Sequence, residues 1–183
     1  MVNLRTVVMD IETSDFRADI GGLMVACFGE LDADGNISEL RINNLDTMGG
    51  GSIAQREKRL VEWTKEQWEY ADIIIGQNHI AFDRHFIDGV LFRYRLPLLK
   101  KRILIDTYQT AKGQFAMSGS MKNMVDIMGL GSKDAPSKED WRNANHGDKA
   151  ALARITGRCV SDVELTAKMW TRLKPIYMTR FGR

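Results

Sequence analysis

Two carboxylates stand at the end of an apolar run near the start of this 183-residue chain. In "RTVVMDIETSDF", Asp10 and Glu12 flank Ile11 directly after the apolar residues. Side chains alternate along a strand, so Asp10 and Glu12 would share one face of it. If that face is buried, the two charges cost several kcal/mol unless cations or hydrogen-bond donors accompany them. The alternative is a strand that runs out into a solvated loop, and the pair alone does not decide between the two.

Two further stretches combine acids with apolar segments. In "IIIGQNHIAFDRHF", the apolar residues are followed by Asn78, His79, Phe82 and Asp83. Asp83 could be a helix-start acid favoured by the helix dipole, and His79 could be a capping or surface residue. In "GRCVSDVELTAKMW", Asp162 lies at the edge of an apolar helix stripe, where an isolated acid is usually solvated.

Taken together, the three stretches place oxygen ligands on a strand, at a helix start and in a late helix. Four carboxylates that the fold crowded into one place would repel each other, and divalent cations relieve such repulsion. Mg²⁺ prefers oxygen ligands from few carboxylates together with substrate phosphates. Such a cluster is the framework for two-metal phosphodiester chemistry.

In order and spacing, these stretches resemble the motifs of the DEDD superfamily of 3′–5′ exonucleases. "DIET" resembles the first motif and "RCVSDVELT" the third. "GQNHIAFD" resembles the second, in the Asn-x-x-x-Phe-Asp spacing of the family B polymerase proofreading domains, and "LIDTYQTA" resembles a segment between the second and third. The resemblance covers most of the chain.

The resemblance implies an α/β, ribonuclease H-like three-layer fold with a central five-stranded mixed sheet flanked by helices, as a single exonuclease domain over residues 1–183. It implies two Mg²⁺ or Mn²⁺ ions held by Asp10, Glu12, Asp83 and Asp162. One ion would activate a water molecule and the other would stabilise the leaving 3′ oxygen. The products would be nucleoside monophosphates, released from the 3′ ends of single-stranded nucleic acid, with DNA favoured over RNA.

By position in the motifs, six residues are expected to contact the substrate: Thr13, Ser14, Met24, Asn78, His79 and Phe82. Thr13 and Ser14 would line the pocket for the terminal nucleotide, and Asn78 would hydrogen-bond the scissile strand. Met24 could wedge against the last base or pack in the core. Phe82 is favoured to pack against its own helix rather than to stack on a base.

The third motif departs from the family pattern at Arg158. The family uses a Tyr four residues before the last Asp, or a His five residues before it, and here those positions are Arg158 and Gly157. An arginine stays protonated at neutral pH and cannot act as a base. We favour a catalytic Arg158 that contacts phosphate or stabilises developing charge while the metals activate the water. Alternatively, His146 in the polar loop before this helix substitutes as the base, or the chain binds 3′ ends without strong catalysis.

The elements that must position these residues are a meander of three strands followed by alternating helices and strands. Strands are expected over residues 4–11, 22–31, 37–43, 71–78 and 102–106. Helices are expected over 53–71, from about 82, over 120–131, and from about 148 to 173, the last limited by Pro175. The polar segment 132–148 is expected to be a loop that could contain one helical turn, where Trp141 could stack on a base or anchor the loop.

The composition limits the classes of protein to which the chain could belong. With 44% hydrophobic and 27% charged residues, the chain fits a soluble globular protein. The net charge of +2 means that nucleic-acid contacts must come from a local patch. Cys27 and Cys159 indicate reduced thiols, and we expect a cytoplasmic monomer with no signal peptide and no membrane contact. An endonuclease or an RNA-directed exonuclease of the same fold remains an alternative function.

Overall fold

The central sheet is built around its first strand. The computed structural model describes residues 4–131 and 136–181. Within them, five strands form one sheet in the order β3-β2-β1-β4-β5. The antiparallel part is the meander of β1 (Thr6–Thr13), β2 (Leu23–Leu31) and β3 (Ile37–Asn44). The parallel part adds β4 (Ile73–Gly76) beside β1 and β5 (Ile103–Asp106) beside β4, so the sheet is mixed.

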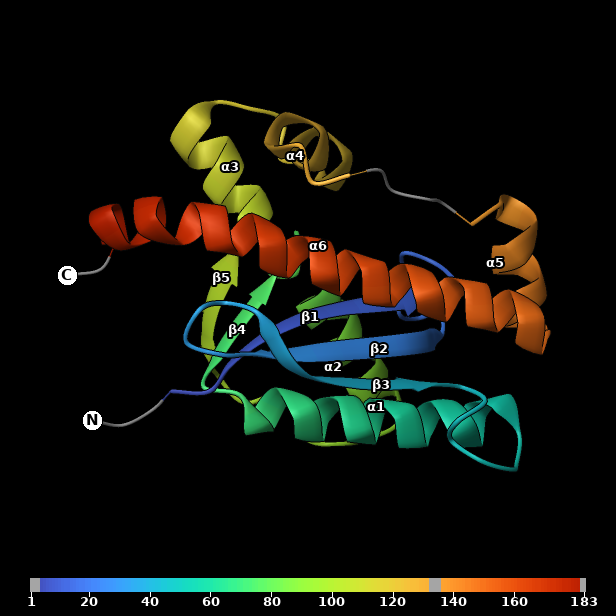
Figure 1. Ribbon diagram of the computed structural model, residues 1–183. Coiled ribbons are helices and arrows are strands. Elements are labelled where there is room, and N and C mark those ends of the chain that lie inside the picture. Colours follow the sequence, from blue (N-terminus) through green and yellow to red (C-terminus); the bar gives the residue numbers. More distant parts are fainter. Residues whose placement is uncertain (1–3, 132–135, 182–183) are drawn as a thin grey trace.

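Helices cover both faces of this sheet and complete three layers (Figure 1). On one face lie α1 (Ile53–Tyr70) and α2 (Asp83–Arg93), which contact each other. The other face is crossed by the long helix α6 (Lys149–Phe181), which contacts β1 and β2. Packed along α6 are α3 (Thr107–Phe115), α4 (Met121–Met128) and α5 (Lys138–Asn145). The expected mixed α/β three-layer fold is therefore confirmed.

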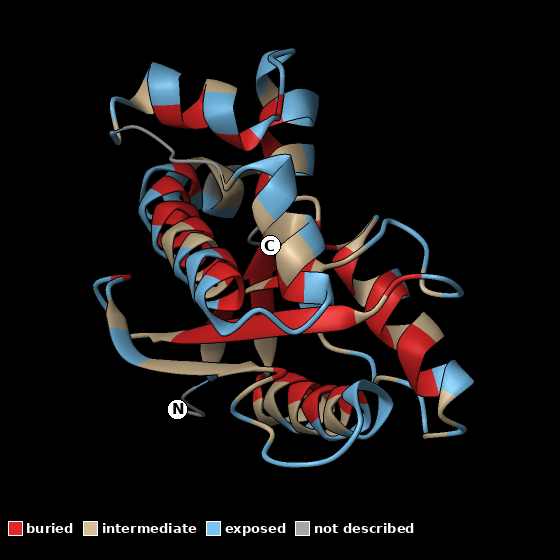
Figure 2. Cartoon of the chain, turned by 90° about the vertical axis from the view of Figure 1, so that its right-hand side faces the viewer, coloured by how far each residue is buried: buried red, intermediate tan, exposed pale blue. Residues whose placement is uncertain are grey.

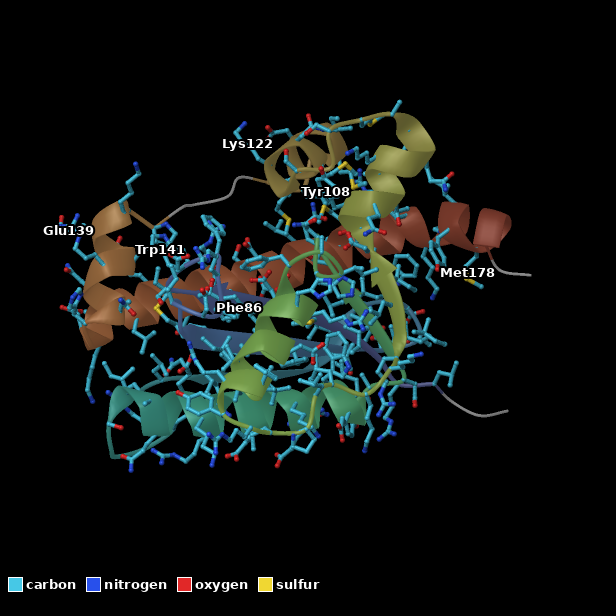
Figure 3. All side chains as sticks on the ribbon, turned by 180° about the vertical axis from the view of Figure 1, so that it is seen from behind. Phe86, Tyr108, Lys122, Glu139, Trp141 and Met178 are labelled. Atoms are coloured by element: carbon cyan, nitrogen blue, oxygen red, sulfur yellow. The ribbon has the colours of Figure 1, made fainter. Side chains whose placement is uncertain are left out.

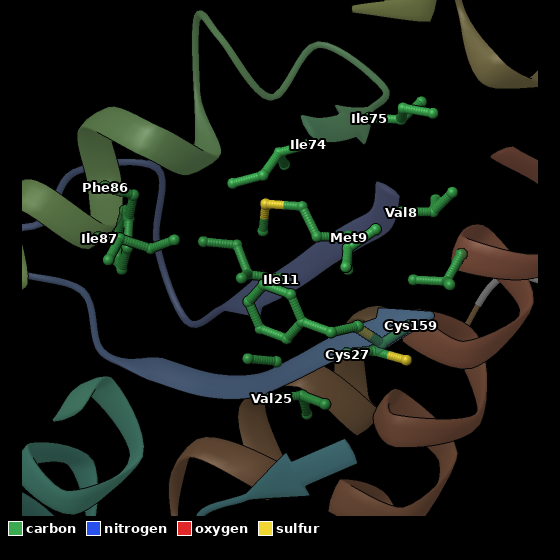
Figure 4. Packing of buried hydrophobic residues seen from close by; sticks show 14 of the residues in the cluster. Val8, Met9, Ile11, Val25, Cys27, Ile74, Ile75, Phe86, Ile87 and Cys159 are labelled. Atoms are coloured by element: carbon green, nitrogen blue, oxygen red, sulfur yellow. The ribbon is translucent and has the colours of Figure 1, made fainter. Parts of the chain in front are cut away.

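The two faces of β1 bury different kinds of side chain. β1 and β2 form the buried centre of the molecule, and the helices bury only the stripe that faces them (Figure 2). Met9 and Ile11 pack toward α2, near Ile74 and Ile87 (Figure 4). Because side chains alternate along a strand, Asp10 and Glu12 point to the opposite face, toward α6.

Three helices differ from the sequence-based expectation. The structure adds α3, whose first turn is capped by the Asp106 side chain accepting the Gln109 amide. Segment 138–145 is a full helix because a capping box of Ser137 and Asp140 starts it, and because Asp140 also pairs with Arg154 on α6. Because these contacts are polar, they produce no apolar periodicity from which the sequence could predict the helices.

The last helix is longer than expected and passes through Pro175 to residue 181. A proline inside a helix costs a backbone hydrogen bond. Trp170 and Tyr177 lie on either side of that point and pack edge to face, with ring centroids 5.5 Å apart, which holds the two parts together. In the described part of the chain, none of the helices, α6 included, is both long and apolar enough to cross a bilayer.

Candidate functional site

Three carboxylates meet between β1 and α6. Asp10 and Glu12 come from the end of β1 and Asp162 from the middle of α6. Each offers a carboxylate oxygen, and these oxygens lie within 4.8 Å of one another. Glu12 and Asp162 are buried and Asp10 is partly buried, so β1 does not end in a solvated loop at this point. We call these three residues, with Asp83, the acid cluster.

Asp83 reaches the cluster from the other helical layer. β4 pairs with β1 only over Thr6–Val8, so the edge of β1 beyond that point is open to another partner. In the first turn of α2, Asp83 takes this place, and its Oδ1 accepts the backbone amide of Ile11 at 3.2 Å. This bond fixes the buried Asp83 carboxylate beside the strand segment that carries Asp10 and Glu12.

The electrostatics of the acid cluster favour a cation. Burial, followed by the charges of Asp83, Glu12 and Asp162, raises the pKa of Asp10 well above its usual range. Burial raises the pKa of Asp83 to about 6, although the charge of His79 and the backbone hydrogen bonds act in the opposite direction. The four carboxylates are hard oxygen donors of the kind that Mg²⁺ and Mn²⁺ bind, and a bound cation would offset the repulsion that acts on Asp10.

Arg158 is the positive charge that the structure places in this cluster. It lies one helical turn before Asp162, and its side chain is 22% exposed. Its Nε donates to Oε1 of Glu12 at 2.9 Å, and its Nη2 lies 3.4 Å from Oδ2 of Asp162. The guanidinium thus bridges the β1 and α6 sides of the cluster.

A cavity of about 560 Å³ adjoins the acid cluster. Its wall includes Glu12 of the cluster and the next two residues of the chain, Thr13 and Ser14. Arg158 and Lys138 supply two cationic side chains to the same wall. The polar lining of the cavity therefore lies directly beside the carboxylates.

Three aromatic side chains line the same cavity: Phe16, Phe82 and Trp141. The rings of Phe16 and Phe82 pack edge to face with centroids 6.1 Å apart, and Phe82 also contacts Phe86 of α2. Trp141 comes from α5, at the end of the molecule where β1 ends (Figure 3). It is half-buried, so it both anchors α5 and presents a surface to the cavity.

The loop between β1 and β2, residues 14–22, is fixed by hydrogen bonds at its two ends and at Ala18. Ser14 donates its amide to the carbonyl of Gly22 at 2.9 Å, and its Oγ accepts the Gly22 amide at 2.8 Å. Arg93 of α2 donates to the carbonyls of Ala18 and Gly21, both at 2.8 Å. Phe16 is 87% exposed although its loop is held in this way.

Two expected substrate contacts are wrong. Met24 is fully buried in β2, so it packs the core and cannot wedge against a base. His79 is also fully buried, with Nδ1 3.6 Å from Oδ2 of Asp106, and it has no surface to offer a nucleotide. It packs so closely on Gly76 that a Cβ there would lie 2.7 Å from the His79 side chain.

Asn78 and His146 lie outside the cavity wall. Asn78 is half-buried in the β4–α2 turn with a φ of 63°, and its amide donates to Asp106 Oδ1 at 3.0 Å. His146 caps the C-terminal end of α5, exposed, with Nδ1 2.7 Å from the carbonyl of Arg142. The cavity is lined by the opposite end of α5, so His146 is not placed to act as a base there.

Among the cavity residues that the sequence did not indicate are Phe16 and Lys138. Phe16 follows the first motif in a polar stretch, and an aromatic residue there was a signal that could have been used. Lys138 gave no such signal, because it reaches the cavity only through the helix that the sequence did not predict.

No protein-family profile and no curated protein matches the chain. Among solved structures, it is similar to the family B DNA polymerase from the hyperthermophilic archaeon Pyrobaculum calidifontis. The TM-score is 0.73 at 15% sequence identity, over 97% of this chain and 25% of that one. At this identity the likeness shows the fold. The chain therefore shares its fold with a segment about a quarter the length of a family B DNA polymerase.

Proposed function

We propose that this chain is a metal-dependent 3′–5′ exonuclease that releases nucleoside monophosphates from the 3′ ends of single-stranded DNA. The observation that carries the proposal is the meeting of the acid cluster with an aromatic- and cation-lined cavity at the end of β1. The motif order and the polymerase-like fold support the same function.

In this proposal, Asp10, Glu12, Asp83 and Asp162 hold two Mg²⁺ or Mn²⁺ ions. When bound, such ions acidify a water molecule and compensate charge on the leaving 3′ oxygen. The role of the protein is to fix the four carboxylates on three rigid elements, β1, α2 and α6. Ligands held on such elements keep their geometry better than ligands on loops.

The cavity would receive the terminal nucleotides. Its three aromatic rings offer faces on which bases of any sequence can stack. Lys138 and Arg158 would pair with phosphates of the backbone. Ser14 Oγ already accepts the Gly22 amide, so its hydroxyl proton can be donated to the substrate.

The test is cleavage of 5′-labelled single-stranded DNA in the presence of Mg²⁺ or Mn²⁺. We expect a ladder of products shortened from the 3′ end, and loss of this ladder in Asp10→Ala and Asp83→Ala. Glu164→Gln is the matched control, because Glu164 is an exposed acid of α6 two residues after Asp162. Folded protein that produces no ladder with either metal would overturn the proposal, as would wild-type rates in either alanine variant.

A second candidate is a module that binds 3′ ends without cleaving them. It is favoured by Arg158, which pairs with two of the acids. In the family that the motifs resemble, a Tyr occupies this position. Binding of labelled DNA without cleavage under both metals would support this candidate. A circular single strand tests the endonuclease alternative, because an exonuclease leaves it intact, and a matched RNA strand tests the RNA-directed one.

A further inference from the structure

Arg158 stands on one side of the acid cluster rather than at its centre. Its two contacts with the cluster run to Glu12 at 2.9 Å and to Asp162 at 3.4 Å. Asp83 comes from α2 instead, and its Oδ1 accepts the amide of Ile11. Glu12 and Asp162 therefore already share an internal cation, whereas the Asp83 carboxylate is held by a backbone amide.

We infer that Arg158 is an internal counter-ion which competes with one of the two metal ions, so that the two metal sites differ in affinity. The inference rests on the proposed function, in which the acid cluster holds two ions. An ion near Asp83 and Asp10 would bind without disturbing the arginine. An ion near Glu12 and Asp162 must share their charge with the guanidinium or displace it.

The physical reason is repulsion between the Arg158 guanidinium and a metal ion bound close to it, at a partly desolvated site. Two like charges a few ångströms apart repel strongly where water screens them poorly, and Glu12 and Asp162 are both buried. The bridge also occupies a Glu12 oxygen through a directed hydrogen bond and an Asp162 oxygen through an ion pair, and an incoming ion must break these contacts. Both effects weaken binding of the second ion without changing the ligand set.

A displaced Arg158 side chain could be accommodated in the cavity. Arg158 already lines the cavity in which the substrate would lie. A guanidinium released from Glu12 and Asp162 could pair with a substrate phosphate there. The phosphate would then replace the carboxylates as its partner. Arg158 would thus link the arrival of the second ion to the presence of a nucleic-acid end.

The test is a calorimetric titration of Mn²⁺ into the protein without nucleic acid, with free Mn²⁺ counted by electron paramagnetic resonance. We expect the wild type to show one tighter and one weaker site. Arg158→Met should tighten the weaker site by about tenfold or more, with a much smaller change at the tighter one. Arg158→Lys keeps the positive charge and should stay close to the wild type.

Arg154→Met is the matched control. Arg154 lies one turn earlier on α6 and pairs with Asp140, outside the acid cluster. Its removal should leave both Mn²⁺ affinities unchanged. If Arg154→Met tightens binding as much as Arg158→Met, the effect is one of overall charge and the inference is wrong.

Stability gives a second readout. Without metal, Arg158→Met should melt at a lower temperature than the wild type, because Glu12 and Asp162 lose their counter-charge, and Mn²⁺ should raise its melting temperature by more. If Arg158→Met does not fold without metal, Arg158→Gln replaces it, since a neutral amide can still donate to Glu12.

The outcomes separate this inference from the proposed function. Two Mn²⁺ ions in the wild type with unchanged affinities in Arg158→Met and Arg158→Gln would overturn the inference alone. Absence of Mn²⁺ binding in the wild type and in both variants would overturn the metal-dependent function as well. Binding of the weaker ion only after Arg158 is replaced would support the inference in its strongest form.

Discussion

The carboxylate of Asp83 accepts a hydrogen bond from the backbone amide of Ile11, at 3.2 Å and across 72 residues of sequence. The amide lies between Asp10 and Glu12, so this one bond sets the position of α2 against both acids of β1. It is possible because the pairing of β4 with β1 stops at Val8. The short length of β4 is therefore part of what brings the fourth carboxylate to the cluster.

Replacing Asp83 with Asn should stabilise the metal-free protein at neutral pH. The amide oxygen can still accept the Ile11 amide, while a buried negative charge is removed. Because burial raises the pKa of Asp83 to about 6, the wild-type protein loses stability as the pH rises through that value. We expect a gain for Asp83→Asn on the order of 2 kcal/mol at pH 8, measured by urea unfolding in the presence of a chelator.

The pH dependence provides the check on this prediction. Below about pH 5 most Asp83 carboxylates are protonated in the folded wild type, so the advantage of Asp83→Asn should shrink there. Saturating Mn²⁺ at pH 8 should reverse the order, because the wild type then gains a ligand that Asn supplies poorly. A variant that is less stable than the wild type at pH 8 in chelator would contradict the prediction.

Asp106 should be needed for the turn that leads to Asp83. Its side chain accepts the amides of Asn78 at 3.0 Å, Ile80 at 3.2 Å and Gln109 at 3.2 Å. Burial acts to raise the pKa of Asp106, but the adjacent His79 and the hydrogen bonds from the backbone amides of Ile80 and Gln109 outweigh it and hold the pKa below its usual range. The stability that Asp106 contributes is therefore fully present above its pKa in the unfolded protein. It is lost as the pH falls through its lower pKa in the folded protein.

Asp106→Ala should accordingly destabilise the protein by about 3 kcal/mol at pH 7, since it leaves three partly buried amides without their acceptor. The difference from the wild type should narrow on acidification toward pH 3. Urea unfolding at several pH values measures both effects. The exposed Asp126→Ala, which removes only a surface pair with Lys122, should cost less than about 1 kcal/mol. Equal losses in the two variants would mean that the turn does not depend on Asp106.

The fold could be predicted because its signals are local and periodic. The β-branched run of β1, the Asp-Gly turn before β3 and the apolar β4 each indicate their own structure, and the alternation of strands and helices then limits the topology. Period two also placed Asp10 and Glu12 on one face, which the structure bears out. That all four acids hold metal remains a prediction.

The parts that could not be predicted depend on contacts between distant residues. α5 is held by Ser137, Asp140 and Arg154, none of which produces an apolar pattern. His79 is buried beside Asp106, which lies 27 residues later in the chain. The bridge from Arg158 to Glu12 spans 146 residues, and no spacing rule reveals such a contact.

Trp141 should contribute to binding of single strands through its ring. Base–aromatic stacking is worth about 1–3 kcal/mol per base, so Trp141→Ala should weaken binding of a short oligothymidine by roughly tenfold or more. Trp141→Phe should retain most of the affinity. Fluorescence anisotropy with labelled oligonucleotide measures the change, and circular dichroism checks that α5 remains folded.

The control for Trp141 is Phe92→Ala, which removes a highly exposed aromatic ring of α2 that does not line the cavity. Its affinity should match the wild type. If Trp141→Ala binds as tightly as the wild type, the ring serves only to anchor α5, and the cavity is not the stacking site.

Arg93 should act on the substrate through the β1–β2 loop. Its guanidinium donates to two loop carbonyls and pairs with the buried Glu57 at 2.5 Å, and Glu57 in turn accepts the Leu23 amide at 2.9 Å. Arg93→Ala should release the loop that carries Phe16 and Ser14 while leaving the acid cluster in place. We therefore expect KM for single-stranded DNA to rise several-fold and kcat to change much less, together with a stability loss of about 2 kcal/mol.

Steady-state cleavage by Arg93→Ala, Arg93→Lys and Lys58→Ala separates this effect from a general loss of charge. Arg93→Lys can keep one of the two carbonyl contacts and should fall between the wild type and Arg93→Ala. Lys58 is an exposed cation of α1 beside Glu57, and its removal should leave KM unchanged. An unchanged KM in Arg93→Ala, with the expected loss of stability, would show that the loop supports the fold but not the cavity. A fall in kcat without a rise in KM would instead connect the loop to the carboxylates themselves.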